Sequence, residues 1–286
     1  MEKSIARGID LGYLCYIWRE RNLVNVIMEE LNLSRNSFYN MWRRLRQKYR
    51  VFLIPNTKRM GLKLVEYSVD YRSNSDNVFF DLKNMMKVKL AYSFSWNIQV
   101  EKGAKVMDTF DIEGVYCFGD NISMLIVPKK TRSIRLRKEQ MIVVSHLTES
   151  FYTAKELQDM TGIPWQKISW DLIYLKRRNF LLSLALILRD RQNYITVKVS
   201  IGDIPSPDDI RPFVIEQPLI LRSLKDDRLY LVFSTTVPKL VEFLNKFAFS
   251  RSSNKIHIEA IYNKYFLPWI TVKDVEAYYK GRNYPL

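Results

Sequence analysis

Residues 153–175 read TAKELQDMTGIPWQKISWDLIYL, and this stretch predicts two helices joined by a tight turn. Thr153, with Glu156 three residues later, forms the capping-box pattern that marks the start of a helix. Gly162 suits the left-handed turn that ends this helix, and Pro164 suits the first position of the next one. A helix, a short turn with an apolar residue and a second helix are typical of a helix-turn-helix motif.

The same pattern occurs about 130 residues earlier in the chain. A shift by that length, without gaps, places apolar residues on apolar residues, as an internal repeat does when only its core pattern is kept. The matched pairs are Leu11 with Met141, Leu14 with Val144, Ile17 with Leu147, Ile27 with Leu157, Leu33 with Ile163, Phe38 with Ile168, Trp42 with Leu172 and Leu45 with Leu175. The sequence therefore predicts a duplicated unit that opens with three helical segments.

Extended segments follow the third helix of each unit and predict a wing. Residues 50–54 and 61–69 are strand-like in the first unit, as are residues 180–188 and 193–201 in the second. If each pair forms a β-hairpin, each module is a winged helix. The expected hairpin tips carry basic residues, which are Lys58 and Arg59 in the first unit and Arg189 and Arg191 in the second.

The second unit continues with a βαββαβ order, which is ferredoxin-like. Its predicted elements are a strand at 193–201, a helix near 206–216, strands at 219–224 and 229–234, a helix with Val237, Leu240, Val241 and Leu244 on one face, and a strand at 256–262. The first unit repeats this order less clearly. Its predicted elements are strands at 61–71, 88–94 and 122–127, a helix at 77–86 and a weaker helix at about 105–117.

The predicted fold class is therefore α+β, a tandem repeat of a winged helix-turn-helix followed by a ferredoxin-like βαββαβ domain. The predicted domains are a first winged helix-turn-helix at 1–60, a degenerate α/β domain at 61–130, a second winged helix-turn-helix with a basic linker at 131–192, a second α/β domain at 193–263 and an aromatic C-terminal extension at 264–286. A helix is expected near 271–280, covering a core.

Composition limits the functional classes. The 286 residues include 45 lysines and arginines but 30 acidic residues, a net charge of +15 that favours a polyanionic partner, either nucleic acid or an anionic membrane surface. Two cysteines and two histidines exclude a disulfide framework and a multi-cysteine zinc site. The longest apolar run, 180–188, is too short to span a bilayer. We expect a soluble, cytoplasmic protein without a metal or cofactor.

The third helix of the first unit is the strongest candidate for contact with nucleic acid. With Phe38, Trp42 and Leu45 facing inward, its outward face is basic and rich in asparagine, the residue types that read guanine and adenine in the major groove. The second module is less basic, and its Trp165 and Trp170 are interpreted as packing on the other half, with contact to sugars and bases as the alternative. The candidate DNA-binding residues are Ser34, Arg35, Asn36, Tyr39, Asn40, Arg43, Arg44, Lys58, Arg59, Gln166, Lys167, Arg189 and Arg191.

A winged helix-turn-helix followed by a βαββαβ domain resembles the Lrp/AsnC (feast/famine) regulators, through element order and through residues 153–157 and 162–164. The resemblance implies a helix-turn-helix that binds operator DNA and an α/β domain that pairs in a dimer and often binds an amino acid. This chain departs from that pattern because two units are fused, and because the glycine–aspartate pattern of the effector domain is not evident around 224–230. An effector and a homodimer through the α/β domains stay open.

The sequence thus predicts a non-enzymatic, sequence-specific transcription regulator that binds double-stranded DNA as a single-chain pseudo-dimer. One alternative is a DNA-organising or replication-associated winged-helix protein without sequence preference. The other is an Lrp-like sirohaem decarboxylase. That reaction would need histidine and arginine in the α/β cleft, whereas His146 falls in a predicted first helix and His257 in a terminal strand.

Overall fold

The computed structural model describes residues 28–29, 32–70, 90–96, 105–119, 123–129, 132–189, 194–248, 256–262, 270 and 272–280. Within these ranges the protein is a mixed α+β structure, as the sequence predicts. The predicted helix at 77–86 and nearly all of the first two helical segments lie outside the described residues, as does Arg191. No described helix is long and apolar enough to cross a membrane.

The three helices of the second module follow the predicted order. They are α6 (Lys138–Glu149), α7 (Ala154–Thr161) and α8 (Trp165–Arg177). The capping box is confirmed, because Thr153 Oγ1 accepts from Glu156 N at 3.3 Å and Glu156 Oε2 accepts from Thr153 N at 2.8 Å. Gly162 ends α7 with a φ of 71°, a left-handed conformation that glycine adopts without steric cost. Pro164 is the N-cap of α8, one residue before its predicted place.

In the first module the structure describes α3 (Arg35–Lys48). Ser34 caps it as predicted, since its Oγ accepts from Ser37 N at 3.2 Å. Phe38, Trp42 and Leu45 are all buried, which confirms the predicted inward face of this helix.

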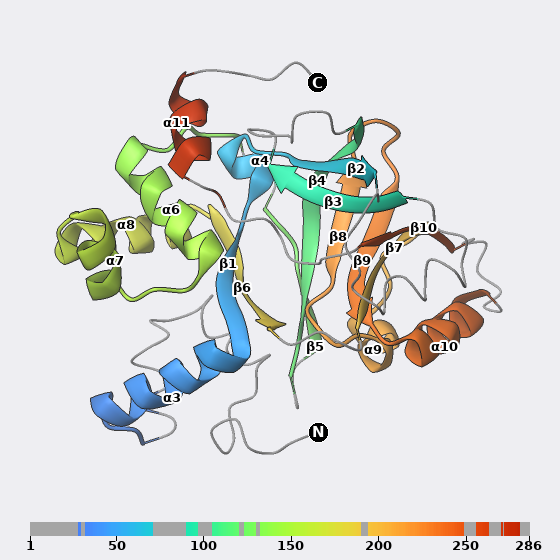
Figure 1. The fold of residues 1–286 in the computed structure, drawn as a ribbon, viewed down its shortest axis with the longest axis horizontal. Coiled ribbons are helices and arrows are strands. Elements are labelled where there is room, and N and C mark those ends of the chain that lie inside the picture. Colours follow the sequence, from blue (N-terminus) through green and yellow to red (C-terminus); the bar gives the residue numbers. More distant parts are fainter. Residues whose placement is uncertain are drawn as a thin grey trace.

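The predicted hairpins are wrong. Strand β1 (Tyr49–Pro55) pairs antiparallel with β6 (Leu181–Leu188) in a two-stranded sheet, which we call the inter-unit ribbon. The register places Tyr49 opposite Leu188 and Leu53 opposite Leu184. Nearly all side chains of both strands are buried, so each strand needs cover on both faces, which a wing on the protein surface cannot supply. Figure 1 shows the ribbon between the helices of the second module and the eight-stranded sheet.

The chain leaves β1 through one helical turn, α4 (Thr57–Met60), and enters a second, eight-stranded sheet. Its strands are β2 (Leu64–Asp70), β3 (Leu90–Trp96), β4 (Lys105–Phe118), β5 (Ser123–Ile126), β7 (Ile195–Ile201), β8 (Leu219–Ser223), β9 (Leu229–Thr235) and β10 (His257–Tyr262). The order is β2-β3-β10-β7-β9-β8-β4-β5, and β2 also pairs with β4. The strands from β2 to β4 therefore form a closed ring, and strands from both halves of the sequence contribute to it.

The part of this sheet from the second unit has the predicted βαββαβ order. Between β7 and β8 lie α9 (Pro207–Ile210) and the 3₁₀ helix η1 (Arg211–Phe213), and α10 (Val237–Ala248) connects β9 to β10. The strand order β10-β7-β9-β8 is antiparallel throughout. Phe213 and Phe243 pack against Phe233 and the other buried residues on one face of these strands.

The predicted helix at 105–117 is wrong, because these residues form β4. Phe110 and Ile112 point into the core whereas Asp111 and Glu113 are only half-buried, so this part of the strand alternates with a period of two. Gly114 lies where the register with β8 shifts, and a Cβ there would meet Leu125 Cδ1 at 2.8 Å. A side chain at this position would therefore require the Leu125 side chain to shift.

The C-terminal helix α11 (Val272–Lys280) lies against α6, near its predicted position. Ile270 and Val275 are buried in the main core, as expected for an extension that covers a core. Tyr278 donates to the Met60 carbonyl at 3.2 Å, and Tyr279 donates to the Leu136 carbonyl. The extension therefore ties the linker before α6 to α4.

Candidate nucleic-acid interface

The exposed face of α3 contains seven of the predicted contact residues. The N-cap and six helix residues are all exposed: Ser34, Arg35, Asn36, Tyr39, Asn40, Arg43 and Arg44. Their exposure follows from the burial of Phe38, Trp42 and Leu45, whose spacing of four and three residues turns one stripe of the helix inward. We call this exposed set the α3 face.

The α3 face is electropositive. The helix contains no acidic residue. Among the residues that the structure describes, Arg35, Arg43 and Arg44 form no ion pair, in contrast to Arg46 of the same helix. The free backbone amides of the first turn add partial positive charge at the end capped by Ser34. A polyanion that approaches this face would therefore meet unneutralised guanidinium groups.

The C-terminal half of α3 is held against the second unit. Arg46 Nη2 lies 2.6 Å from Glu156 Oε1, and the Trp42 ring meets the Phe151 ring edge-on at 5.5 Å. Burial raises the pKa of Glu156, but hydrogen bonds from Thr153 and Arg46 outweigh this effect and leave that pKa below its usual value. Glu156 thus caps α7 and fixes α3 with one carboxylate. The sequence offers the capping box as a signal for the first role and none for the second.

Arg189 does not lie at a wing tip, because no wing forms. Its Nε donates to the Arg46 carbonyl at 2.9 Å, and its backbone N–H donates to the Lys48 carbonyl at 3.0 Å. These carbonyls belong to the last turn of α3, where a cation is favoured by the helix dipole. Arg189 therefore positions the candidate recognition helix.

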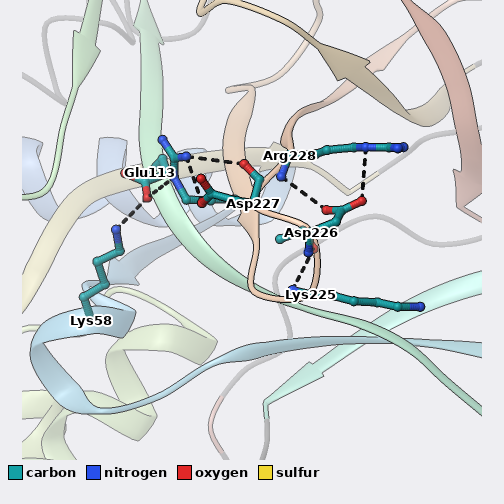
Figure 2. A network of polar contacts seen from close by, with 8 residues as sticks. Lys58, Glu113, Lys225, Asp226, Asp227 and Arg228 are labelled. Atoms are coloured by element: carbon teal, nitrogen blue, oxygen red, sulfur yellow. Dashed lines mark hydrogen bonds and ion pairs between the residues drawn. The ribbon is translucent and has the colours of Figure 1, made fainter.

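The prediction that Lys58 and Arg59 lie at a wing tip is also wrong. Both residues belong to α4, between β1 and the eight-stranded sheet. Lys58 Nζ lies 2.6 Å from Glu113 Oε1, which also accepts from Arg222 Nε at 2.9 Å. Figure 2 shows Lys58 pointing toward Glu113, with Asp227 on the other side of this network. Arg59 is 7% exposed, donates to the Arg132 carbonyl and lies 5.2 Å from the Phe180 ring centroid. Neither side chain is available as a tip.

The second module presents a different surface. Gln166 is exposed, but Lys167 is paired with Glu139. Trp165 and Trp170 are 50% and 72% exposed, so the interpretation that they pack on the other half is wrong. Among the described residues, neither indole stacks on another ring. The exposed positive charge of α8 is therefore confined to its C-terminal end, at Arg177, whereas that of α3 extends along the helix.

The basic linker between the units is folded onto the protein over its described part. Ile134 N donates to the Arg59 carbonyl at 2.9 Å. The Arg135 guanidinium lies over the Tyr278 and Tyr279 rings at 5.5 and 5.1 Å, and Arg137 Nη2 lies 2.9 Å from Asp171 Oδ1. These arginines therefore join α8 and α11 to the linker.

The described residues contain no group of three or more histidine, cysteine, aspartate or glutamate side chains that could hold a metal ion. His146 is half-buried on α6 with its ring 6.3 Å from that of Tyr152, and burial lowers the pKa of His146. His257 is exposed on β10.

No protein-family model matches the sequence, and neither a curated protein nor a solved structure matches it.

Proposed function

We propose that this protein binds double-stranded DNA and regulates transcription at specific sequences, with α3 as its recognition helix. The observation that carries the proposal is the α3 face, where arginines without an ion-pair partner among the described residues and exposed asparagines share one side of a capped helix. A solvated surface helix has no need of this combination, because basic side chains on ordinary surfaces are interspersed with acidic ones.

The chemistry of recognition follows from the order of residues along α3. The N-terminal half, with Arg35, Asn36 and Asn40, enters the major groove, where arginine pairs with guanine O6 and N7 and asparagine pairs with adenine N6 and N7. Arg43 and Arg44 lie one turn further along and contact bases or the phosphates at the groove edge. Ser34 and the first-turn amides face a phosphate at the helix N-terminus.

The duplicated units act in this proposal as a pseudo-dimer. The inter-unit ribbon joins the segments that follow α3 and α8, as a two-fold contact would join them in a homodimer. Because the exposed charge of α8 is confined to its C-terminal end, α3 supplies most of the affinity for DNA. The chain therefore reads one half-site strongly, and its target sequence is asymmetric.

Selection of DNA from a random pool at near-physiological salt tests this proposal. We expect one enriched motif, and a preference of about 10³-fold or more over random sequence. Failure to enrich any motif, with similar affinity for all sequences, would support the DNA-organising alternative. No binding to any DNA would overturn both functions.

Substitutions on the α3 face test its assignment on the selected site. Arg43→Ala and Asn40→Ala should each weaken specific binding by about 1–3 kcal/mol, because each removes one base contact. Lys225→Ala is the matched control, because it removes one exposed positive charge from the β8–β9 turn, outside α3. Unchanged affinity in the α3 variants, or an equal loss in the control, would refute the assignment.

A further inference from the structure

The outward face of α8 is an apolar surface at the position where α3 is polar. The internal repeat allows this comparison residue by residue, because buried residues of α8 occupy the positions of Phe38 and Leu45. At the outward positions the repeat exchanges Arg35 for Trp165, Asn40 for Trp170, Arg43 for Ile173 and Arg44 for Tyr174. All four replacements are at least 37% exposed. Three arginines and one asparagine of α3 thus correspond to large, mainly apolar side chains on the outward face of α8.

These side chains form a continuous surface. Trp170, Ile173 and Tyr174 are three and four residues apart, so they are neighbours on the helix, and Met160 of α7 adds a 47% exposed side chain near its start. α7 and α8 lie at the outer edge of the molecule, away from the eight-stranded sheet (Figure 1). Contiguous exposed apolar residues of this kind mark contacts with another macromolecule, whereas isolated ones need no explanation.

The charges around this surface indicate a second copy of the chain in antiparallel orientation. Lys176, Arg177 and Arg178 lie at the C-terminal end of α8. At the other end, Gln158 Oε1 accepts from Trp165 N at 2.9 Å, which holds this part of α7, including the exposed Asp159, beside the first turn of α8. A parallel pair would bring the two basic ends together. An antiparallel pair separates them by about 20 Å, the length of 13 helical residues, which exceeds the screening length in physiological salt.

We propose that two copies of this chain associate through the outward faces of their α8 helices, packed antiparallel about a two-fold axis. Trp170 of each copy packs on Ile173 of the other, because these residues lie symmetrically about the middle of the apolar surface. Arg177 of each copy then lies beside Trp165 and Asp159 of the other, so a guanidinium meets an indole face and a carboxylate. This proposal does not depend on DNA binding, because it uses only α7 and α8.

The mass of the full chain as a function of concentration tests the proposal. A single helix face is smaller than the roughly 800 Å² per partner of a standard interface, so we expect a dimer with a dissociation constant in the micromolar range. Analytical ultracentrifugation from about 1 to 200 µM should show the mass rising from 34.1 kDa toward twice that value. A mass of 34.1 kDa at every concentration would overturn the proposal.

Variants locate the contact. Trp170→Glu and Ile173→Glu should each raise the dissociation constant more than about tenfold, because each buries a charge in the apolar contact. Val241→Glu on α10 is the matched control, since Val241 is also an exposed apolar residue, 51% exposed, and its variant should associate normally. Circular dichroism checks that each variant is folded. Association that survives Trp170→Glu, or a variant that loses only DNA affinity, would assign this face to another ligand and overturn the proposal.

A charge exchange tests the antiparallel orientation. Asp159→Arg and Arg177→Glu should each weaken the dimer about two- to thirtyfold, the range of two exposed ion pairs, because the two-fold axis repeats the pair; the double variant should recover the wild-type dissociation constant. Loss without recovery in the double variant would refute the proposed orientation.

Discussion

The ion pair between Lys198 and Glu66 joins β7 to β2 inside the closed ring of strands. Lys198 Nζ on β7 lies 2.5 Å from Glu66 Oε2 on β2, and the two side chains are 9% and 1% exposed. The ammonium group also lies 5.1 Å and 4.9 Å from the ring centroids of Phe110 and Tyr230. Among the described residues, its charged and aromatic contacts are thus one carboxylate and two ring faces.

Glu66→Gln should lower the free energy of unfolding by about 3 kcal/mol. Removing one partner of a buried pair costs about 3–5 kcal/mol, because the remaining charge keeps its desolvation cost without its counter-charge. The two rings retain part of the stabilisation of Lys198, since each cation–π contact contributes on the order of 1 kcal/mol, which places the expected loss at the lower end. With a urea m-value of about 3 kcal/mol/M, the unfolding midpoint should fall by about 1 M.

Urea unfolding followed by circular dichroism and tryptophan fluorescence measures this loss. The double variant Glu66→Gln with Lys198→Met should recover most of it, because no charge is then left buried. Glu276→Gln is the matched control, since Glu276 and Lys280 form an exposed pair at 3.9 Å whose removal should change stability by less than about 0.5 kcal/mol. A loss below about 1 kcal/mol for Glu66→Gln, or no recovery in the double variant, would refute the reasoning.

Three further predictions concern the pH dependence, the turn and the position of α3. Burial raises the pKa of Glu113, but the ion pairs with Lys58 and Arg222 outweigh this effect and hold that pKa below its usual value. Glu113 therefore stabilises the fold above about pH 4.5, and this stabilisation is lost as the pH falls. The stability of Glu113→Gln should fall less steeply below that pH than the stability of the wild type, and an unchanged pH profile would contradict the assignment. Gly162→Ala should lower the free energy of unfolding by about 1 kcal/mol, because φ is 71° at this position and a side chain makes that left-handed conformation unfavourable. The melting temperature should therefore fall, and an unchanged melting temperature would be inconsistent with this turn. Arg189→Ala should weaken DNA binding about two- to tenfold, because it removes the cation that holds the last turn of α3. The circular dichroism spectrum of the variant should be unchanged. A variant that binds DNA with wild-type affinity would exclude a positioning role for Arg189.

Local structure could be predicted from the sequence because its causes lie within a few residues. The buried stripe of α3 follows from the spacing of Phe38, Trp42 and Leu45. The start and end of α7 follow from Thr153 and Gly162, which act on backbone groups next to them. For the same reason the exposed residues of α3 could be assigned correctly without knowing anything else about the fold.

Pairing between distant segments could not be predicted in the same way. Residues 50–54 are strand-like whether they pair with 61–69 or with β6, and only the burial of both faces of β1 decides between these partners. The wrong hairpins then placed Lys58, Arg59 and Arg189 at tips, although their partners lie in β4, the linker and α3. The strand β4 did have a local signal, the alternation from Phe110 to Glu113, which a helical interpretation of 105–117 overlooked.

The closed ring of strands also bears on how the N-terminal and C-terminal halves of the chain depend on each other. An unpaired strand edge offers free amides and carbonyls to any other chain, and proteins protect such edges because they start aggregation. Here β4 from the N-terminal half of the chain pairs with β8 from the C-terminal half, and β3 from the N-terminal half pairs with β10 from the C-terminal half. Either half expressed alone would expose both of these edges. In the full chain, pairing between the halves covers strand edges that would otherwise be open to self-association.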